Sequence, residues 1–390
     1  MTSQAEPRAP AEPHRLWIER LRASDFRNYE TLSVELDERP VVLTGPNGAG
    51  KTNLLEAVSL LAPGRGLGRT QFAEMIRHGT AGWALNAKLH CVHGEVDIGT
   101  GFSADGETTA RKVRINGETA RSAGALGDYT RTIWLTPAMD GLFTGSAGER
   151  RRFLDRLIQS LDPGYRSNLS RFERAMRQRN RLLEDGEASP ARYEGFETQL
   201  AEAGTAIAAT RLDTVTRLAR LCDAPGRKED AGSPFPWAVL ELEGLLEGRL
   251  LSEAAVDVED FYRETLARVR ERDRAAKRTL EGPHRSDLIV GHGPKAAPAR
   301  GCSTGEQKAL LIGLVLAHAE LVKQQSEGYA PLILLDEIVA HLDEVRREGL
   351  FHEIERLSAQ AWMTGTDAAH FAPMGARAQQ FRVENGGVSA

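Results

Sequence analysis

The sequence has few cysteines, no long apolar run and no apolar N-terminal segment, and each of these features argues against a class of protein. Its three cysteines, Cys91, Cys222 and Cys302, have neither paired nor metal-type spacing, which is typical of a reduced cytoplasmic protein. No stretch approaches the roughly 18 consecutive apolar residues of a membrane-spanning helix, so we expect no membrane association. Residues 1–14 are polar and lack the apolar core of a signal peptide, and we expect a disordered tail there.

The basic charge is mostly arginine and is unevenly distributed. The 390 residues carry 55 acidic and 50 basic side chains, and the net charge of −5 taken alone argues against a nucleic-acid partner. Only eight basic residues are lysine, and arginine is the better ligand for phosphate oxygens. Residues 150–181 contain ten arginines and three acids, a local net charge of +7, and residues 263–278 carry a further +4.

Two interpretations of these basic segments stay open. Clustered arginine is typical of a surface that binds a polyanion, but it is equally typical of a solvated helix face with ion pairs one turn apart. The candidates for contact with a polyanion are Arg150, Arg151, Arg152, Arg174, Arg177 and Arg181.

Apolar patterning predicts an α/β fold whose two halves lie at the ends of the chain. Alternating or short continuous apolar runs predict strands at 16–22, 32–37, 41–43, 83–91, 131–135, 287–290 and 332–335. An Asn116-Gly117 pair predicts a hairpin turn. Helical spacing predicts helices after about residue 147, within 199–221 and 256–280, and at 306–322. We therefore expect an α/β domain at 15–146 and 282–390, interrupted by an arginine-rich helical domain at 147–281.

A glycine-rich loop between a strand and a helix predicts a phosphate-binding site. The segment Gly45–Thr52 matches G-x-x-x-x-G-K-[ST], and backbone N–H groups of such a loop bind phosphate oxygens together with the helix N-terminus. Lys51 is expected to reach the β- and γ-phosphates and the Thr52 hydroxyl to bind Mg²⁺. The expected nucleotide-binding residues of the loop are Gly45, Pro46, Asn47, Gly48, Ala49, Gly50, Lys51 and Thr52.

A buried strand that ends in two acids predicts the metal carboxylate. Residues 332–335 are apolar, Asp336 is expected to hold Mg²⁺ through water, and Glu337 is expected to polarise the attacking water as a general base. Lys51 and Asp336 are 285 residues apart, far more than a compact nucleoside kinase places between them. A large insertion therefore separates the two halves of the site.

The segment Ser303–Gln307 opens an apolar helix and has two compatible interpretations. Ser303 and Glu306 form an S-x-x-E capping box, which stabilises a helix without any ligand. The same helix N-terminus, with Gly305, also presents a hydroxyl and free N–H groups to a phosphate.

Taken in order, these motifs resemble those of the ABC-type ATPases. Gly45–Thr52 resembles Walker A, Ser303–Gln307 the signature, Leu335–Glu337 Walker B and His341–Asp343 the D-loop. More narrowly, the chain resembles the RecF family of DNA repair proteins over about residues 16–370. The segments that carry this likeness are Phe26–Tyr29, Pro63–Leu67, Arg151–Asp155, Gly282–Arg285 and Ser303–Lys308.

The resemblance implies an ABC-type ATPase domain with an antiparallel β-subdomain, with ATP and Mg²⁺ as ligands and Lys51 and Glu337 as catalytic residues. It also implies an ATP-dependent homodimer that clamps DNA. In that dimer the signature of one subunit meets the γ-phosphate bound by the other, and Asp343 crosses the interface. The residues placed in trans are Ser303, Gly305 and Glu306. Arg27 and Asn28 would lie near the nucleotide, and the six arginines become candidate DNA-binding residues.

The family likeness further implies partners and a cellular role. We expect a cytoplasmic, nucleoid-associated protein of replication, recombinational gap repair and the response to DNA damage. It would bind gapped duplexes, junctions of single and double strands, and single-stranded DNA. With RecO and RecR it would help to load RecA, and DNA would stimulate a weak ATPase activity.

Two positions depart from the wider ABC pattern, and alternatives remain. Thr364 follows Met363 where a switch histidine is normal, and only Asp140 is available in the expected place of the Q-loop glutamine; both differences predict slow hydrolysis. The alternatives are the ATPase subunit of a membrane transporter and an SMC-like chromosome-organising ATPase. The arginine-rich segment argues against the first, and the absence of sustained heptads argues against the second. A small-molecule kinase has no use for Ser303–Gln307.

Overall fold

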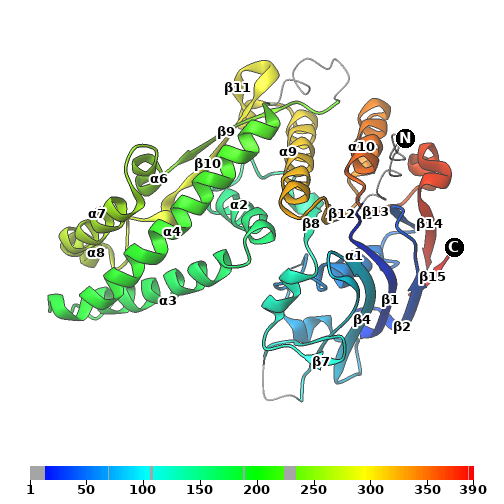
Figure 1. Ribbon diagram of the computed structural model, residues 1–390, viewed down its shortest axis with the longest axis horizontal. Coiled ribbons are helices and arrows are strands. Elements are labelled where there is room, and N and C mark those ends of the chain that lie inside the picture. Colours follow the sequence, from blue (N-terminus) through cyan, green and yellow to red (C-terminus); the bar gives the residue numbers. More distant parts are fainter. Residues whose placement is uncertain (1–13, 69, 106–108, 188, 224–233, 385) are drawn as a thin grey trace, which may run out of the picture. The chain divides into compact units, whose positions relative to one another are not determined.

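The structure divides the chain into two compact units, which are described separately. It is a computed structural model and describes residues 14–390 except 69, 106–108, 188, 224–233 and 385 (Figure 1). The first unit takes residues up to 134 and from 322 onward, and the second takes 135–321. The expected helical insertion, 147–281, lies wholly within the second unit, which also includes 135–146 and 282–321. Of the expected N-terminal tail, only His14 is among the described residues.

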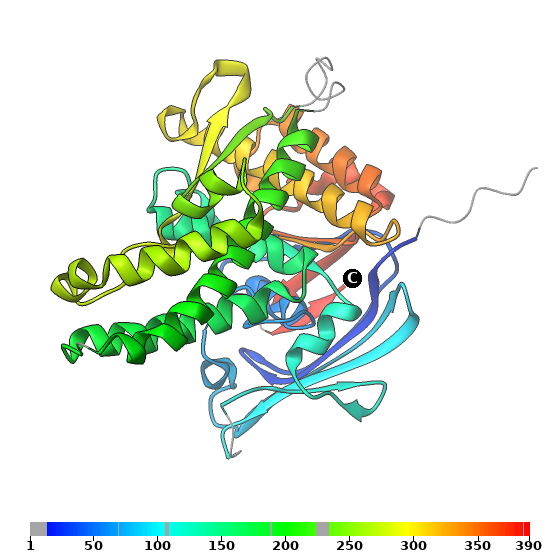
Figure 2. The same cartoon turned by 60° about the vertical axis from the view of Figure 1, so that its left-hand side comes forward.

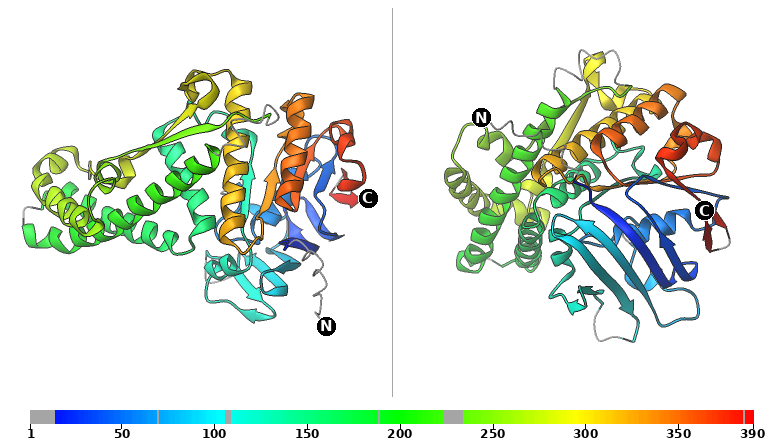
Figure 3. Two further views of the ribbon diagram at one scale, coloured as in Figure 1. Left: turned by 45° about the horizontal axis from the view of Figure 1, so that its top comes forward. Right: turned by 45° about the vertical axis from the view of Figure 1, so that its right-hand side comes forward.

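The first unit contains the expected antiparallel subdomain, a sheet of six strands whose alternating side chains face the core. In β4, for example, Trp83, Leu85 and Leu89 are buried while intervening residues are more exposed. The predicted hairpin turn joins β6 to β7, and Asn116 and Gly117 have the φ values of 50° and 84° that a type I′ turn needs. The sheet is seen in blue to cyan in Figures 2 and 3. Its strands, in spatial order, are β2 Tyr29–Glu35, β1 Trp17–Phe26, β4 Gly82–Cys91, β5 Gly94–Ser103, β6 Lys112–Ile115 and β7 Glu118–Thr119.

A second sheet in the same unit has a parallel centre. Strands β14, β3, β13 and β12 run parallel, and β15 pairs antiparallel with β14 at the edge. Because parallel strands are covered on both faces, β12 and β13 are buried at every position. The order is β15 Gly387–Ser389, β14 Gln379–Glu384, β3 Val41–Thr44, β13 Ala361–Gly365, β12 Leu332–Leu335 and β8 Thr132–Leu135.

One apolar core joins both sheets to the helix after the glycine-rich loop. It brings together Trp83 and Ile98 from the antiparallel sheet, Leu43 and Trp362 from the parallel strands, and Leu55 from the helix. This packing fixes the loop between β3 and α1 against two rigid layers. The helices of the unit are α1 Lys51–Ser59 and α10 Glu344–Leu357, with 3₁₀ turns η1 Phe72–Met75, η2 Ala123–Asp128, η7 Val339–His341 and η8 Ala368–Arg377.

The second unit is mainly helical, as expected, with a small sheet of strands β11, β10 and β9. Helix α3 packs along the long helix α4 (Figure 2). The helix expected over 256–280 is interrupted, because Val269 separates α7 from α8 and Lys277 ends α8 in a left-handed conformation. The elements are η3 Pro137–Met139, α2 Ala147–Leu161, α3 Tyr165–Glu184, α4 Pro190–Cys222, β9 Ala238–Glu243, α6 Leu245–Leu250, α7 Ala255–Arg268, α8 Arg270–Ala276, η4 Pro283–Arg285, β10 Asp287–His292, η5 Gly293–Lys295, β11 Ala297–Pro298, η6 Ala299–Gly301 and α9 Thr304–Gln325.

A buried ion network fixes three of these helices to one another. The Arg179 guanidinium, which is fully buried, donates to Glu197 at 3.2 Å, to Asp273 at 2.7 Å and to Thr279 at 2.8 Å. Removing one partner would leave a buried charge uncompensated, which costs several kcal/mol in typical proteins. Part of the arginine excess is therefore structural. Among the described residues, no helix is both long and apolar enough to cross a membrane.

Candidate nucleotide-binding site

The loop Gly45–Thr52 has the conformation of a phosphate cradle. Gly45, Gly48 and Gly50 all have positive φ, at 150°, 80° and 113°. Two of them are also crowded: a Cβ on Gly45 would overlap the Val383 carbonyl, and one on Gly50 would overlap the Asn28 amide. Only glycine fits these positions, so the loop curls between β3 and α1 with the helix N-terminus at its end.

Thr52 meets the second half of the motif at the carboxyl end of β12. The Thr52 hydroxyl lies 2.9 and 3.1 Å from the two carboxylate oxygens of Asp336, although the residues are far apart in sequence. These hard oxygen donors fit Mg²⁺, which prefers carboxylate and hydroxyl ligands. The Lys51 ammonium, which is buried, donates to the carbonyls of Gly45 and Pro46 at 2.7 and 3.0 Å and so lies over the cradle.

Thr364 is a site residue whose role the sequence did not predict. It stands on β13 where a switch histidine was expected, and its side chain is fully buried. Its hydroxyl donates to Asp336 at 2.8 Å and accepts from the Glu337 amide at 2.9 Å. Glu337 has a positive φ of 52°, an uncommon conformation for glutamate that this contact supports. The threonine thus positions both acids of the strand end.

The turn between β1 and β2 lies on the loop, but its two candidate residues differ. Asn28 donates to the Ala49 carbonyl at 3.1 Å and accepts from Asn53 at 2.7 Å, which places it beside the cradle; its contact with nucleotide stays a prediction. Arg27 instead directs its guanidinium to the Glu56 carboxylate, at 2.6 and 2.9 Å. Its proposed contact with nucleotide would require this pair to open. The hydroxyl of Tyr29, which was not predicted as a site residue, donates to the Gly50 carbonyl at 3.0 Å.

The signature segment begins α9 in the second unit and has the predicted capping box. The Ser303 hydroxyl accepts from the Glu306 amide at 3.4 Å, and the Glu306 carboxylate accepts from the Ser303 amide at 3.0 Å. Ser303 and Gly305 are exposed. Asp140, the candidate for the Q-loop position, forms an ion pair with Lys308 at 3.2 Å and so contacts the signature helix directly.

Asp343 caps the helix that follows Walker B. Its carboxylate accepts from the Arg346 amide at 2.8 Å, and the side chain is 57% exposed. This is the helix-start role that a Leu-Asp pair after a strand usually has. Because the Asp343 side chain is exposed, it is accessible to a second subunit, and its place in a dimer interface stays a prediction.

The candidate DNA-binding arginines separate into two groups. Arg150 donates two hydrogen bonds to Asp287, at 2.8 and 2.7 Å, and Arg151 donates to the Ser286 carbonyl at 2.5 Å, so both fasten α2 to the start of β10. The exposed members face solvent on α2 and α3. They are Arg152, Arg174, Arg177 and Arg181. Arg177 and Arg181 lie 3.8 and 3.9 Å from acids one turn away, loose contacts that an anion can replace.

Comparison with known proteins assigns the family. The model for the RecF/RecN/SMC N-terminal domain matches residues 17–389. The DNA replication and repair protein RecF of Rhizobium etli is 54% identical over 96% of this chain and 99% of its own, and that of Mesorhizobium japonicum is 54% identical over 97% and 98%. The chain belongs to the RecF family.

Solved structures agree with this RecF assignment at the level of the fold. A structure described as the recombination mediator protein RecF with ATPrS in the RecFOR pathway has a TM-score of 0.84 at 22% identity, over 97% of this chain and 98% of that one. An Smc head domain from Pyrococcus furiosus, with an extended coiled coil, has a TM-score of 0.53 at 17% identity. The expected ABC-type fold is confirmed. Because the chain belongs to the RecF family, the transporter subunit and the small-molecule kinase are excluded as alternatives.

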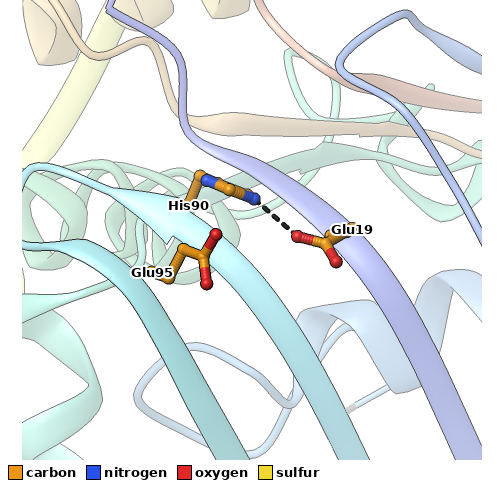
Figure 4. A group of neighbouring side chains, drawn as sticks. All are labelled: Glu19, His90 and Glu95. Carbon is orange, nitrogen blue, oxygen red and sulfur yellow. Dashed lines mark hydrogen bonds and ion pairs between the residues drawn. The ribbon is translucent and has the colours of Figure 1, made fainter.

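A second polar cluster of this RecF-family chain lies on the antiparallel sheet. Glu19, His90 and Glu95 each offer a ligand atom within 4.8 Å of the others (Figure 4). Lys88, however, bonds to Glu19 at 3.0 Å and to Glu95 at 3.1 Å. These bonds lower the pKa of Glu19, first through His90 and then through Lys88, and raise the pKa of Lys88. The ammonium bridges the two carboxylates, and we assign the cluster to ion pairing across the strands.

Proposed function

We propose that this chain is an ATP-dependent DNA-binding protein of DNA replication and recombinational gap repair. The names of its RecF relatives support the repair role. The observation that carries the nucleotide role is the contact between Thr52 and Asp336, because it joins the Walker A and Walker B motifs at one point. A similar solved structure is described as RecF with ATP, which supports ATP as the ligand.

The residues around this contact have separate tasks in hydrolysis. Backbone N–H groups of Gly45–Thr52 would bind the phosphates and Lys51 would contact the γ-phosphate. Mg²⁺, held by Thr52 and through water by Asp336, would neutralise phosphate charge. Glu337 would orient and polarise the attacking water. Thr364 occupies the place of the switch histidine, and its hydroxyl is bonded to the Asp336 carboxylate and the Glu337 amide. We therefore propose that hydrolysis is slow.

We further propose that ATP joins two copies of the chain into a DNA clamp. The exposed Ser303 hydroxyl, with Gly305 and Glu306, would meet the γ-phosphate bound by the other copy, and Asp343 would lie at the interface. The exposed arginines of α2 and α3 would bind the DNA backbone. The description of the similar structure as part of the RecFOR pathway supports RecO and RecR as partners. The proposed outcome is RecA loading in the cytoplasm.

Sedimentation and DNA binding test this proposal together. We expect the full chain to be monomeric without nucleotide and dimeric with ATP and Mg²⁺. It should then bind gapped duplex and single-strand junctions more tightly than in the absence of ATP. Ser303→Ala should bind ATP normally but dimerise weakly. A chain that stays monomeric in ATP would refute the clamp, and DNA binding indifferent to ATP would refute the coupling.

A further inference from the structure

Lys295 contacts the signature from outside the motif. It lies in η5, and its Nζ is 2.5 Å from one carboxylate oxygen of Glu306. The other oxygen of that carboxylate accepts from the Ser303 amide at 3.0 Å. One carboxylate is therefore held between an ammonium and the capping N–H at the start of α9. The contact was not predicted, because η5 and α9 are joined by β11 and η6 and carry no common local pattern.

The Glu306 carboxylate would repel any anion that approaches the signature. Its bond to Lys295, and then its bonds to Ser303, lower the pKa of Glu306 to about 2, so the side chain is charged at every physiological pH. A negative charge at the helix N-terminus cancels the positive end of the helix dipole and repels a triphosphate. Lys295 is half exposed and Glu306 a quarter exposed, so the pair lies at the open end of the helix.

The next two polar side chains of the segment are buried and hydrogen-bonded within the second unit. Gln307 and Lys308 are buried, and they bond to the Cys302 carbonyl and to Asp140. They fix the helix but do not compensate Glu306. Among the described residues, Lys295 is the cation that forms an ion pair with that carboxylate.

We propose that Lys295 is a positioning residue of the nucleotide-dependent dimer. It neutralises Glu306 and holds it on the Ser303 amide, so that the Ser303 hydroxyl meets the γ-phosphate of the other copy without opposing charge. This inference rests on the proposed function. It adds a residue that acts through Glu306 and Ser303 and does not itself belong to the motif.

The test separates charge from capping, because glutamine serves a capping box as well as glutamate. Dimerisation is measured by sedimentation in Mg²⁺ and a slowly hydrolysed ATP analogue for the parental chain, Lys295→Ala, Glu306→Gln and the double variant. Lys295→Ala should weaken dimerisation on the order of tenfold, since it leaves like charges facing each other. High salt should shrink the defect. The double variant should return to within about twofold of the parental value, because both charges are gone.

Two measurements keep the outcomes distinct. Binding of a fluorescent ATP analogue to the monomer should be equal in all variants, since their Walker A loops are unchanged. Arg249→Ala, which breaks the comparably exposed pair with Glu253, should dimerise as the parental chain does. The inference would be overturned if Lys295→Ala dimerised as well as the parental chain, or if the double variant dimerised as weakly as Lys295→Ala. Neither result would contradict the proposed ATP-dependent dimer. A parental chain that does not dimerise would overturn the proposed function and this inference with it.

Discussion

At the scale of single residues, the site depends on hydroxyl groups that make two contacts at once. Thr364 donates to Asp336 and accepts from the Glu337 amide, and Thr52 donates to the same aspartate. A hydroxyl can serve as donor and acceptor simultaneously, which lets one small buried side chain position two acids. Asp336 is thus oriented from both α1 and β13. The acids that follow β12 are preorganised for metal and water.

Lys51→Ala tests the phosphate cradle. The lysine ammonium lies over the loop and is bonded only to the carbonyls of Gly45 and Pro46 among the described residues, so it is available to a phosphate. Its loss should weaken ATP binding by at least about a hundredfold, since charged hydrogen bonds in a buried site are worth several kcal/mol. Titration with a fluorescent ATP analogue measures this. The exposed Lys112→Ala serves as the control, and parental affinity in Lys51→Ala would contradict the assignment.

Glu337→Gln tests the general base. Glutamine keeps the size of the side chain and the backbone contact with Thr364, but it cannot accept the proton of the attacking water. Turnover should fall about 10²–10⁴-fold with ATP binding retained, the usual range for loss of a general base. The dimer should accumulate in ATP. Phosphate release and sedimentation are the measurements, and hydrolysis at the parental rate would remove Glu337 from the mechanism.

At the scale of elements, local pattern predicted the strands with contiguous or regularly alternating apolar residues and the turns with a characteristic sequence. The strand expected at 332–335 is β12 with the same bounds, and the loop, helix α1 and hairpin turn were also predicted. Strand β9 was missed because exposed acids alternate with its apolar residues. The segment is recognisable as a strand only from its pairing with β10. The partner of Arg27 was missed for the same kind of reason, since Glu56 lies on another element. Contacts between distant segments carry no local signal.

The packing of α9 on α2 predicts a dependence of stability on pH. His318 is fully buried on α9 and donates from Nε2 to the Leu157 carbonyl at 3.0 Å, and its Nδ1 has no hydrogen-bond partner among the described residues. Burial lowers its pKa from 6.5 to about 4. Between these values the unfolded chain binds a proton that the folded chain does not. The free energy of unfolding should therefore fall as the pH drops from about 6.5 to 4, by up to about 1.4 kcal/mol per pH unit.

His318→Gln provides the comparison for this effect, because glutamine can donate to the same carbonyl but does not titrate. Its denaturant midpoint should depend less steeply on pH than that of the parental chain below pH 6.5. The exposed His78→Gln should follow the parental curve. Parallel curves for the parental chain and His318→Gln would show that this histidine does not contribute.

At the scale of the whole molecule, the net charge of −5 conceals how the arginines are used. Arg179 is fully buried in a network with Glu197 and Asp273, and Arg150 is paired with Asp287, so part of the basic segment holds helices together. The sequence could not separate these residues from their exposed neighbours, because arginines occur on several faces of these helices and no local pattern shows which face is buried. Burial distinguishes them, since Arg152 and Arg174 are exposed and form no ion pair among the described residues.

The last prediction concerns these two exposed arginines. If they bind DNA phosphates, Arg152→Ala combined with Arg174→Ala should weaken ATP-dependent binding to gapped duplex and reduce the slope of log K against log salt by about 2, since each lost phosphate contact removes roughly 0.9. Fluorescence anisotropy over a range of salt concentrations gives both quantities. Arg22→Ala, on the exposed face of the antiparallel sheet, removes one positive charge elsewhere and should leave the slope unchanged. A uniform loss of affinity in both variants would indicate a nonspecific effect of net charge, and an unchanged slope in the double variant would place the DNA on another surface.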